Sequence, residues 1–451
     1  MVARQTNLTQ GRVSRQLIKY AVPVMLTSIL QAVYGLVDML VVSHMIGDAG
    51  ASGVNNAAQV MHLITQISIG LSNGGNIMVG QYFGNKDEKK RLETTGTLFS
   101  MFAVLGIVVS IIAFLGAAPF LKFMGAPAYD EAFAYLRVCT LGLFFVFGYN
   151  ALASVLRAMG NSRAPLYFIF VSTVVNIGLD LWFVGPLQMG TAGAALATVI
   201  SQGIAFVLAL MYMLRAKELF TFTRDALRIR ADKVKLILRV GVPSAVQMTV
   251  ASISWLTVTY LINDYGTIWS AANGFSGKIK DFLLQFISAM SVATASMIAQ
   301  NLGAKEYDRA KKTMYTAMKL TISMSVVFIV LVEITAPSLM SIFTKTPEVV
   351  AAGTLNLRIE IVSQVFYAVF LIYHSLMLGA GDTWWVLISS FSNCILFRLI
   401  LAIIFEHFWN INGVFIACAI APTISIPIGI HYFNSNRWKK SLAEKHAGLK
   451  I

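Results

Sequence analysis

Long apolar runs separated by short polar loops dominate this chain of 451 residues. A helix needs about 20 consecutive, mostly apolar residues to cross the hydrocarbon core of a bilayer. Runs of that length lie near residues 17–43, 57–82, 94–118, 133–157, 165–186, 191–214, 236–262, 277–300, 314–339, 355–378, 384–406 and 411–433. The pattern therefore predicts an all-α membrane protein with twelve transmembrane helices.

The two halves of the chain resemble each other at an offset of about 220 residues. The segment YAVPVML from Tyr20 matches VGVPSAV from Val240, and VGQYFGNKDEKK from Val79 matches IAQNLGAKEYDRAKK from Ile298. Each half holds six runs, so the repeats enter the membrane in the same orientation. We therefore expect two six-helix lobes related by a pseudo-two-fold axis along the membrane normal, with a cleft between them.

The repeat and the charged stretch in its middle suggest the domain boundaries. We expect an N-lobe over residues 1–214, a cytoplasmic linker over 215–234 and a C-lobe over 235–451, which ends in a basic tail. The stretch before Tyr20 is polar and basic, which is unlike a cleavable signal peptide.

Composition supports the membrane interpretation. Charged residues make up 12% of the chain and the mean hydropathy is +0.70, whereas soluble domains carry about 25% charged residues. The net charge of +14 comes from Lys and Arg in alternate loops, so it indicates topology rather than nucleic-acid binding. The positive-inside rule then places both termini in the cytoplasm.

Two acidic residues interrupt the apolar runs of the first half. A charge inside a bilayer costs several kcal/mol, so such acids are candidates for function. Asp38 lies deep in the first run, and Gln31 and Tyr34 share its helix face. Asp180 lies in the fifth run.

Polar partners accompany these acids. Asn176 lies one turn before Asp180, and Thr198 in the sixth run lies at a similar depth. Two carboxylates, an amide and a hydroxyl could hold a hard cation such as Na⁺, or the acids could bind a proton. The alternative is a structural role, with the acids bonded to hydroxyls of neighbouring helices.

The repeat argues against a purely structural role. The equivalent positions in the second half hold Val258, Phe397, Leu401 and Cys418. Helix contacts required by a symmetric fold should themselves be symmetric, so this asymmetry favours function.

The second half carries polar residues of its own. Structural roles are favoured for most of them, with Lys280 pairing with its neighbour Asp281 or extending to the interface. Residues that could line the cleft, besides Tyr34 and Tyr135, are Met248, Trp255, Lys278, Lys280, Asp281, Gln364 and His374, while Glu333 and Glu360 lie near span ends.

Motifs of catalysis are missing from the sequence. It has no GxxxxGK[ST] phosphate loop, no nucleophile elbow, no HExxH and no Asp-rich diphosphate motif. Cys139, Cys394 and Cys418 lie in apolar runs without the spacing of a disulfide framework or a zinc site. We expect neither an enzyme nor a bound cofactor.

The chain resembles the multidrug and toxic compound extrusion (MATE) family over nearly its full length. The resemblance rests on VPVMLTSILQAVYGLVDMLVVSHMIG, VGQYFGNKD, NALASVLRAMGNSRAP, NIGLD, GTAGAALATVIS, AQNLGAKEYDRAK and LMLGAGDTWW. It implies a monomeric, multi-pass antiporter in a prokaryotic plasma membrane, exporting small, often cationic and amphipathic compounds in exchange for H⁺ or Na⁺. The alternative is a flippase for a lipid-linked saccharide, for which Lys278 and Lys280 would supply cationic groups.

The resemblance also implies a site. One prokaryotic branch has an N-lobe cation site that this chain matches at Asp38, Asn176, Asp180 and Thr198, with Tyr135 and Asn150 at neighbouring positions. Another branch relies on a glutamate in the seventh span and an aspartate in the tenth, and both are missing here. One departure is Leu181, because a proline linked to bending of the first helix often follows the aspartate.

Overall fold

The computed structural model describes residues 7–123, 128–440 and 442–443. These residues form helices and connecting turns, with no strand among them. In chain order the first helices are α1 (Val13–Met45), α2 (Asp48–Gly84), α3 (Glu88–Phe123), α4 (Tyr129–Leu141), α5 (Leu143–Ala158), α6 (Arg163–Val184) and α7 (Gly190–Arg215). They are followed by α8 (Ala231–Asn263), α9 (Thr267–Gly303), α10 (Tyr307–Phe343), α11 (Pro347–Ile361), α12 (Ser363–Ala380), α13 (Thr383–Phe391), a π-helix η1 (Ser392–Leu399), α14 (Ile400–Ile420), a 3-10 helix η2 (Ala421–Ile424), α15 (Ser425–Asn434) and a 3-10 helix η3 (Arg437–Lys439).

The chain forms two compact units. Unit 1 contains Leu26–Ala245, and unit 2 contains Leu8–Met25 together with the described part of Val246–Ile451. The linker predicted over 215–234 belongs to unit 1. Both α1 and α8 change unit shortly after an internal proline, Pro23 and Pro243 respectively.

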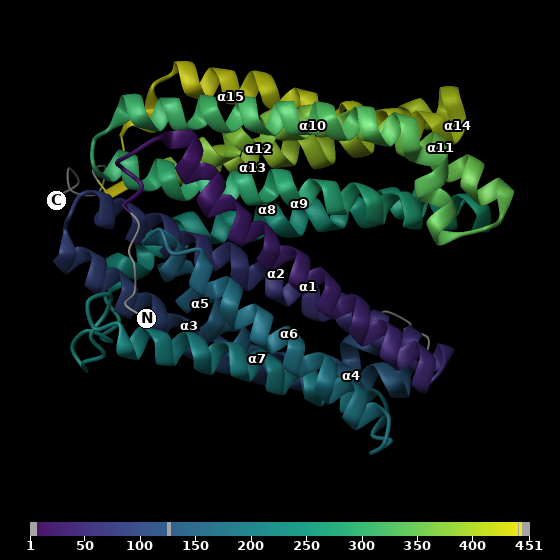
Figure 1. The fold of residues 1–451 in the computed structure, drawn as a ribbon, viewed down its shortest axis with the longest axis horizontal. Coiled ribbons are helices and arrows are strands. Elements are labelled where there is room, and N and C mark those ends of the chain that lie inside the picture. Colours follow the sequence, from purple (N-terminus) through teal and green to yellow (C-terminus); the bar gives the residue numbers. More distant parts are fainter. Residues whose placement is uncertain (1–6, 124–127, 441, 444–451) are drawn as a thin grey trace. The chain divides into compact units, whose positions relative to one another are not determined.

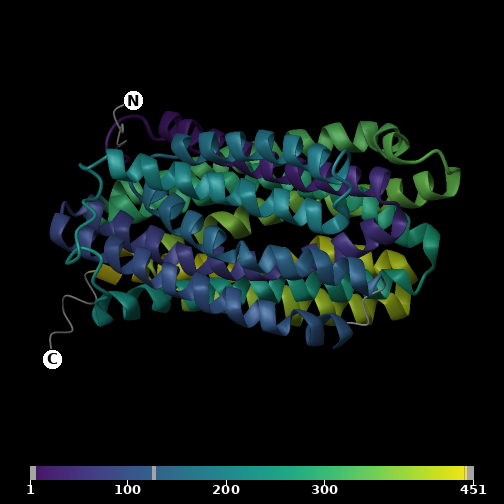
Figure 2. The ribbon, with the colours of Figure 1, turned by 90° about the horizontal axis from the view of Figure 1, so that it is seen from below.

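The same packing recurs in each unit. In unit 1, α2 packs against α3, α4 and α5, and α6 packs along α7. In unit 2, α9 packs against α10, α11 and α12, and α15 contacts α12 and α13. Within each unit the helices run side by side (Figure 1, Figure 2).

Turn geometry repeats as well. Lys86 and Lys305 end α2 and α9 with left-handed φ values of 57° and 60°. Gly160 and Gly381 end α5 and α12 with φ of 77° and 81°, a conformation that glycine adopts at little cost. The duplicated sequence therefore folds into duplicated helix ends.

All twelve predicted runs are helical. Among the described residues, nine helices are long and apolar enough to span a membrane, or ten when α4 and α5, bent by 48°, count as one span. The segment Thr383–Asn434 is one of these nine candidate spans, but it covers the last two predicted runs. Trp409 and Asn410, whose backbone is not helical, separate the two runs. The 37-residue α2 is the remaining predicted span.

Large apolar side chains cover the outside of these helices. Leu115, Ile334 and Ile342 are 70%, 74% and 75% exposed. A water-soluble protein exposes few such contiguous apolar surfaces, whereas lipid tails solvate them. Inside unit 1, Phe102, Phe147 and other buried apolar residues form the core.

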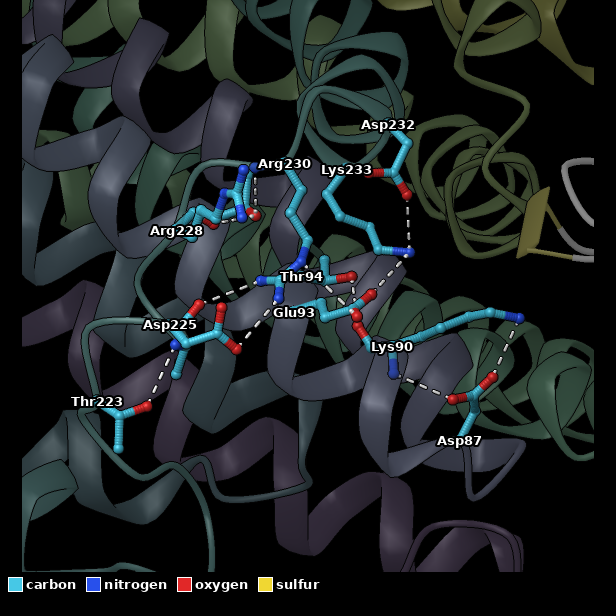
Figure 3. Close-up of polar contacts among 12 residues, drawn as sticks. Asp87, Lys90, Glu93, Thr94, Thr223, Asp225, Arg228, Arg230, Asp232 and Lys233 are labelled. Atoms are coloured by element: carbon cyan, nitrogen blue, oxygen red, sulfur yellow. Dashed lines mark hydrogen bonds and ion pairs between the residues drawn. The ribbon is translucent and has the colours of Figure 1, made fainter.

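Ion pairs fix the linker to α3 within unit 1. The Glu93 carboxylate forms ion pairs with Arg230 at 3.7 Å and with Lys233 at 3.5 Å. It lies between the two cations (Figure 3). Arg91 donates to the carbonyl of Leu219 at 2.7 Å. The linker is therefore bound to the lobe that precedes it.

Candidate functional site

The helices of unit 1 bring the predicted acids into its interior. Asp38 on α1 is 5% exposed, and Asn176 and Asp180 on α6 are fully buried. Thr198 lies on α7, which packs along α6, and is 5% exposed. Asn176 and Asp180 are one helical turn apart, so both side chains leave the same face of α6.

Within the described part of the chain, one side-chain hydrogen bond satisfies this group. The Tyr135 hydroxyl, from α4, donates to Asp38 Oδ2 at 3.0 Å. Polar atoms of the group that are buried without a hydrogen-bond partner are Tyr34 OH, Asp38 Oδ1, both amide atoms of Asn176, both carboxylate oxygens of Asp180 and Thr198 Oγ1. Buried polar atoms normally have partners, so this concentration of unsatisfied oxygens is typical of a site that binds something.

Electrostatic interactions connect these side chains. Asp180 interacts with Asp38 and Asn176, and Tyr34 interacts with Thr198 and both acids. Apart from the bond from Tyr135, these contacts fall short of hydrogen-bond geometry. The side chains are thus near neighbours with space between them.

No described basic side chain neutralises the acids. None of the ion pairs of the described residues includes Asp38 or Asp180. Nor do three or more His, Cys, Asp or Glu side chains of the described part come together as a metal cluster would require. The group offers two carboxylates, amide and hydroxyl oxygens, which suit a proton or a monovalent hard cation.

Two other predicted members lie outside this group. Gln31 is exposed, although it shares the helix with Asp38. Asn150 is buried but donates to Ser68 Oγ at 3.2 Å, which joins α5 to α2.

The predicted residues of unit 2 form a different arrangement. Lys280 is buried and forms its ion pair with Glu360 Oε2 at 2.6 Å, whereas it interacts with its neighbour Asp281 electrostatically without an ion-pair contact. The ion pair joins α9 to α11 across 80 residues, which spacing along one helix cannot reveal. Lys278 and Asp281 are exposed.

The other candidates of unit 2 are scattered. Glu333 forms an exposed ion pair with Arg358 at 3.5 Å. Gln364 Oε1 and His374 Nε2 are buried without partners, and the His374 ring lies 4.1 Å from that of Phe370. Met248 is partly buried, and Trp255 is 38% exposed.

Sequence reasoning did not single out Arg398. This residue of η1 is 1% exposed and lies in the middle of the predicted run 384–406. The signal was available, because a lone arginine far from both ends of an apolar run is as costly as a lone acid.

Long apolar helices in two repeated units, with acids buried inside one of them, are typical of a membrane transporter. The MatE family model matches residues 23–182 and 243–404, so the chain belongs to this family of transporters. The two matches fall in the two halves of the internal repeat.

Curated relatives are similar along the whole chain. The probable multidrug resistance protein YoeA of Bacillus subtilis is 27% identical over 437 residues, which cover 94% of each chain. The probable multidrug resistance protein YpnP of the same organism is 26% identical and covers 96% of this chain and 97% of its own.

Solved structures share the fold. A MOP superfamily transporter from Pyrococcus furiosus, described as having a binding pocket of reverse polarity, has a TM-score of 0.91 at 21% identity and covers 98% of this chain and 100% of its own. A MATE structure in complex with MaL6 has a TM-score of 0.91 at 21% identity, and the match covers 96% of this chain and 98% of the MATE chain. The all-α, multi-span fold expected from the sequence is therefore confirmed.

Proposed function

We propose that this transporter is a secondary active efflux antiporter that exports small, often cationic and amphipathic compounds in exchange for H⁺ or Na⁺. The observation that carries the proposal is the pair of buried, unneutralised carboxylates, Asp38 and Asp180, surrounded by unsatisfied oxygens. The relatives named as multidrug resistance proteins support the direction of transport. We place the protein in the plasma membrane with both termini in the cytoplasm.

The coupling cation would act through α1 and α6. Two carboxylates buried near each other repel, and a cation or proton between them removes part of that repulsion. Asp38 belongs to α1 and Asp180 to α6, so occupancy would draw the two helices together. A ligand shifts a conformational equilibrium only by its differential affinity for the two states, and neutralisation of this pair supplies such a difference.

Transport in vesicles tests the coupling. Efflux should respond to a separately imposed pH or sodium gradient, and Asp38→Asn and Asp180→Asn should each abolish that response while the protein still folds. The matched control is Asp130→Asn, the same substitution at an exposed acid of unit 1, which should transport normally. Full gradient-driven efflux by either buried-acid variant would overturn the mechanism.

The alternative, a flippase for a lipid-linked saccharide, loses part of its basis. Lys280 is neutralised by Glu360, so it is not a free cation for a diphosphate. Rescue of a cell-wall precursor defect without any drug resistance would favour the flippase.

A further inference from the structure

Arg398 is a buried arginine of unit 2 that forms none of the ion pairs of the described residues, and Glu360, paired with Lys280, interacts with it only electrostatically. It lies on η1, a π-helical segment within an otherwise α-helical span. Such segments are rare and are frequent at functional sites. The offset of 221 residues that relates Gly160 to Gly381 places Arg398 opposite Ile177, next to Asn176 of the cation site.

All direct contacts of the guanidinium are neutral. Nη1 donates to Ser254 Oγ at 3.4 Å, and Nη2 donates to the hydroxyl of Tyr367. The Trp255 ring lies 4.3 Å from Cζ. No described carboxylate forms an ion pair with Arg398, and Glu360 already pairs with Lys280.

Donors remain free at this point. Arg398 Nε is buried without an acceptor. The Tyr367 oxygen accepts from Arg398, which leaves its own proton free to donate. Ser254, by contrast, already donates to the Cys394 carbonyl at 2.6 Å.

A buried arginine cannot relieve its charge by losing a proton, because the guanidinium stays protonated in proteins. It therefore requires a counter-ion, and its planar fork matches a carboxylate or phosphate. Nε and the Tyr367 hydroxyl present two donors for such a group.

We propose that Arg398, with Tyr367 and Trp255, forms a binding site in unit 2 for the carboxylate or phosphate of an anionic aromatic substrate. This inference rests on the proposed efflux function, because it names a substrate class for that transporter. Of the contacts of Arg398, only Trp255 is more than a third exposed. Its ring covers the guanidinium, and an aromatic ligand would replace that stacking when the ring turns aside.

Neighbouring amides suit the same ligand. Gln364 lies one turn before Tyr367 on α12, and Asn393 precedes Arg398 on η1; the side-chain oxygen of each is buried without a partner. An amide can rotate to present its NH₂ group instead. Both would then add donors for an anion.

Binding of matched probes to the purified full-length protein tests the site. We expect 1-naphthoate to bind about tenfold or more tightly than 1-naphthamide, which has the same rings but no charge. Arg398→Gln should abolish that difference. The control Arg358→Gln removes an exposed arginine of the same unit and should preserve it.

Two results would overturn the proposal. One is equal affinity of the wild-type protein for both probes, which needs no variant and so does not depend on folding. The other is unchanged naphthoate selectivity in folded Arg398→Gln protein. Arg398→Lys, which keeps the charge but loses the planar fork, should retain an intermediate selectivity.

Competition identifies the source of the anion. If phosphatidylglycerol in nanodiscs displaces 1-naphthoate, the site accepts lipid phosphate; if it does not, the site takes soluble carboxylates. Wild-type protein that prefers naphthoate but shows no gradient-driven efflux would defeat the proposed function alone. Wild-type protein that shows gradient-driven efflux without that preference would defeat only this site.

Discussion

Charged side chains inside this protein fall into two kinds. Lys280 and Glu360 neutralise each other at 2.6 Å, and Lys280 also donates to Asn356 at 3.3 Å. Asp38, Asp180 and Arg398 form none of the ion pairs of the described residues, although Glu360 interacts with Arg398 electrostatically. The paired residues are explained as structure, whereas the unpaired ones require a ligand.

A double-mutant cycle tests the structural role of the Lys280–Glu360 pair. Glu360→Gln leaves a buried ammonium without its partner, and such a loss costs about 3–5 kcal/mol. We expect a large fall in the thermal unfolding temperature in detergent. Lys280→Met combined with Glu360→Gln removes both charges and should recover most of the loss.

The exposed pair provides the control. Arg358 and Glu333 are 47% and 39% exposed, and exposed ion pairs contribute about 0–1 kcal/mol. Glu333→Gln should therefore change the unfolding temperature little. A fall as large as that of Glu360→Gln would contradict the distinction between the two pairs.

The sequence allowed the acids of unit 1 to be predicted but not their surroundings. Asp38 and Asp180 stood out because each interrupts an apolar run. The pairing of Lys280 with Glu360 depends on how α9 packs against α11, and no pattern within one helix encodes it. Arg398 could have been identified by the reasoning used for the acids.

At the scale of elements, the start of α3 depends on a side-chain cap. Asp87 Oδ1 accepts a hydrogen bond from the backbone N–H of Lys90 at 3.0 Å, which satisfies one of the free donors of the first turn. Partial burial raises the pKa of Asp87, but hydrogen bonds from the backbone and side chain of Lys90 outweigh it and hold the pKa below its ordinary 3.8.

Asp87→Ala should destabilise the protein by about 1 kcal/mol at neutral pH, because the cap is lost. A lowered folded-state pKa gives stability that is present above the ordinary value and is lost as pH falls through the folded value. The difference between Asp87→Ala and wild type should therefore shrink below pH 3.8. Denaturation of both proteins in detergent at several pH values measures this difference in stability.

The repeat supplies the matched control. Glu306 holds the equivalent position before α10 but makes no side-chain capping bond. Glu306→Ala should cost less than Asp87→Ala. Equal losses for the two variants would show that the cap of Asp87 contributes little.

Helix positions followed from hydrophobic runs, but breaks inside the runs did not. The run 133–157 is two helices that meet at Gly142, and the run 355–378 is divided near Val362. The first break lies among apolar residues, where a membrane helix could equally continue, and the second lies beside Glu360, Ser363 and Gln364. They depend on packing against neighbouring helices rather than on local composition.

At the scale of the whole molecule, duplication has preserved backbone turns while charge has diverged. Gly47 and Gly266 start equivalent helices with φ of 93° and 94°. The charged residues differ, because the repeat pairs Asp180 with an apolar residue, Leu401, and Arg398 with another, Ile177. A fold constrained by symmetry thus carries buried acids in one unit and a buried arginine without an ion-pair contact in the other. Such an arrangement suits a transporter that couples a cation to a differently charged substrate.

The proposed direction of transport depends on which side of the membrane each loop faces. Cysteine labelling tests that topology. Cys139, Cys394 and Cys418 are buried, so they should react little with a membrane-impermeant maleimide. Lys89 and Gln188 are exposed and lie in loops of opposite predicted sides, the first rich in Lys and the second almost free of basic residues. In intact cells Gln188→Cys should label and Lys89→Cys should not, whereas in inverted vesicles the two should exchange. The opposite labelling would place the termini outside and reverse the direction assigned to the cation gradient.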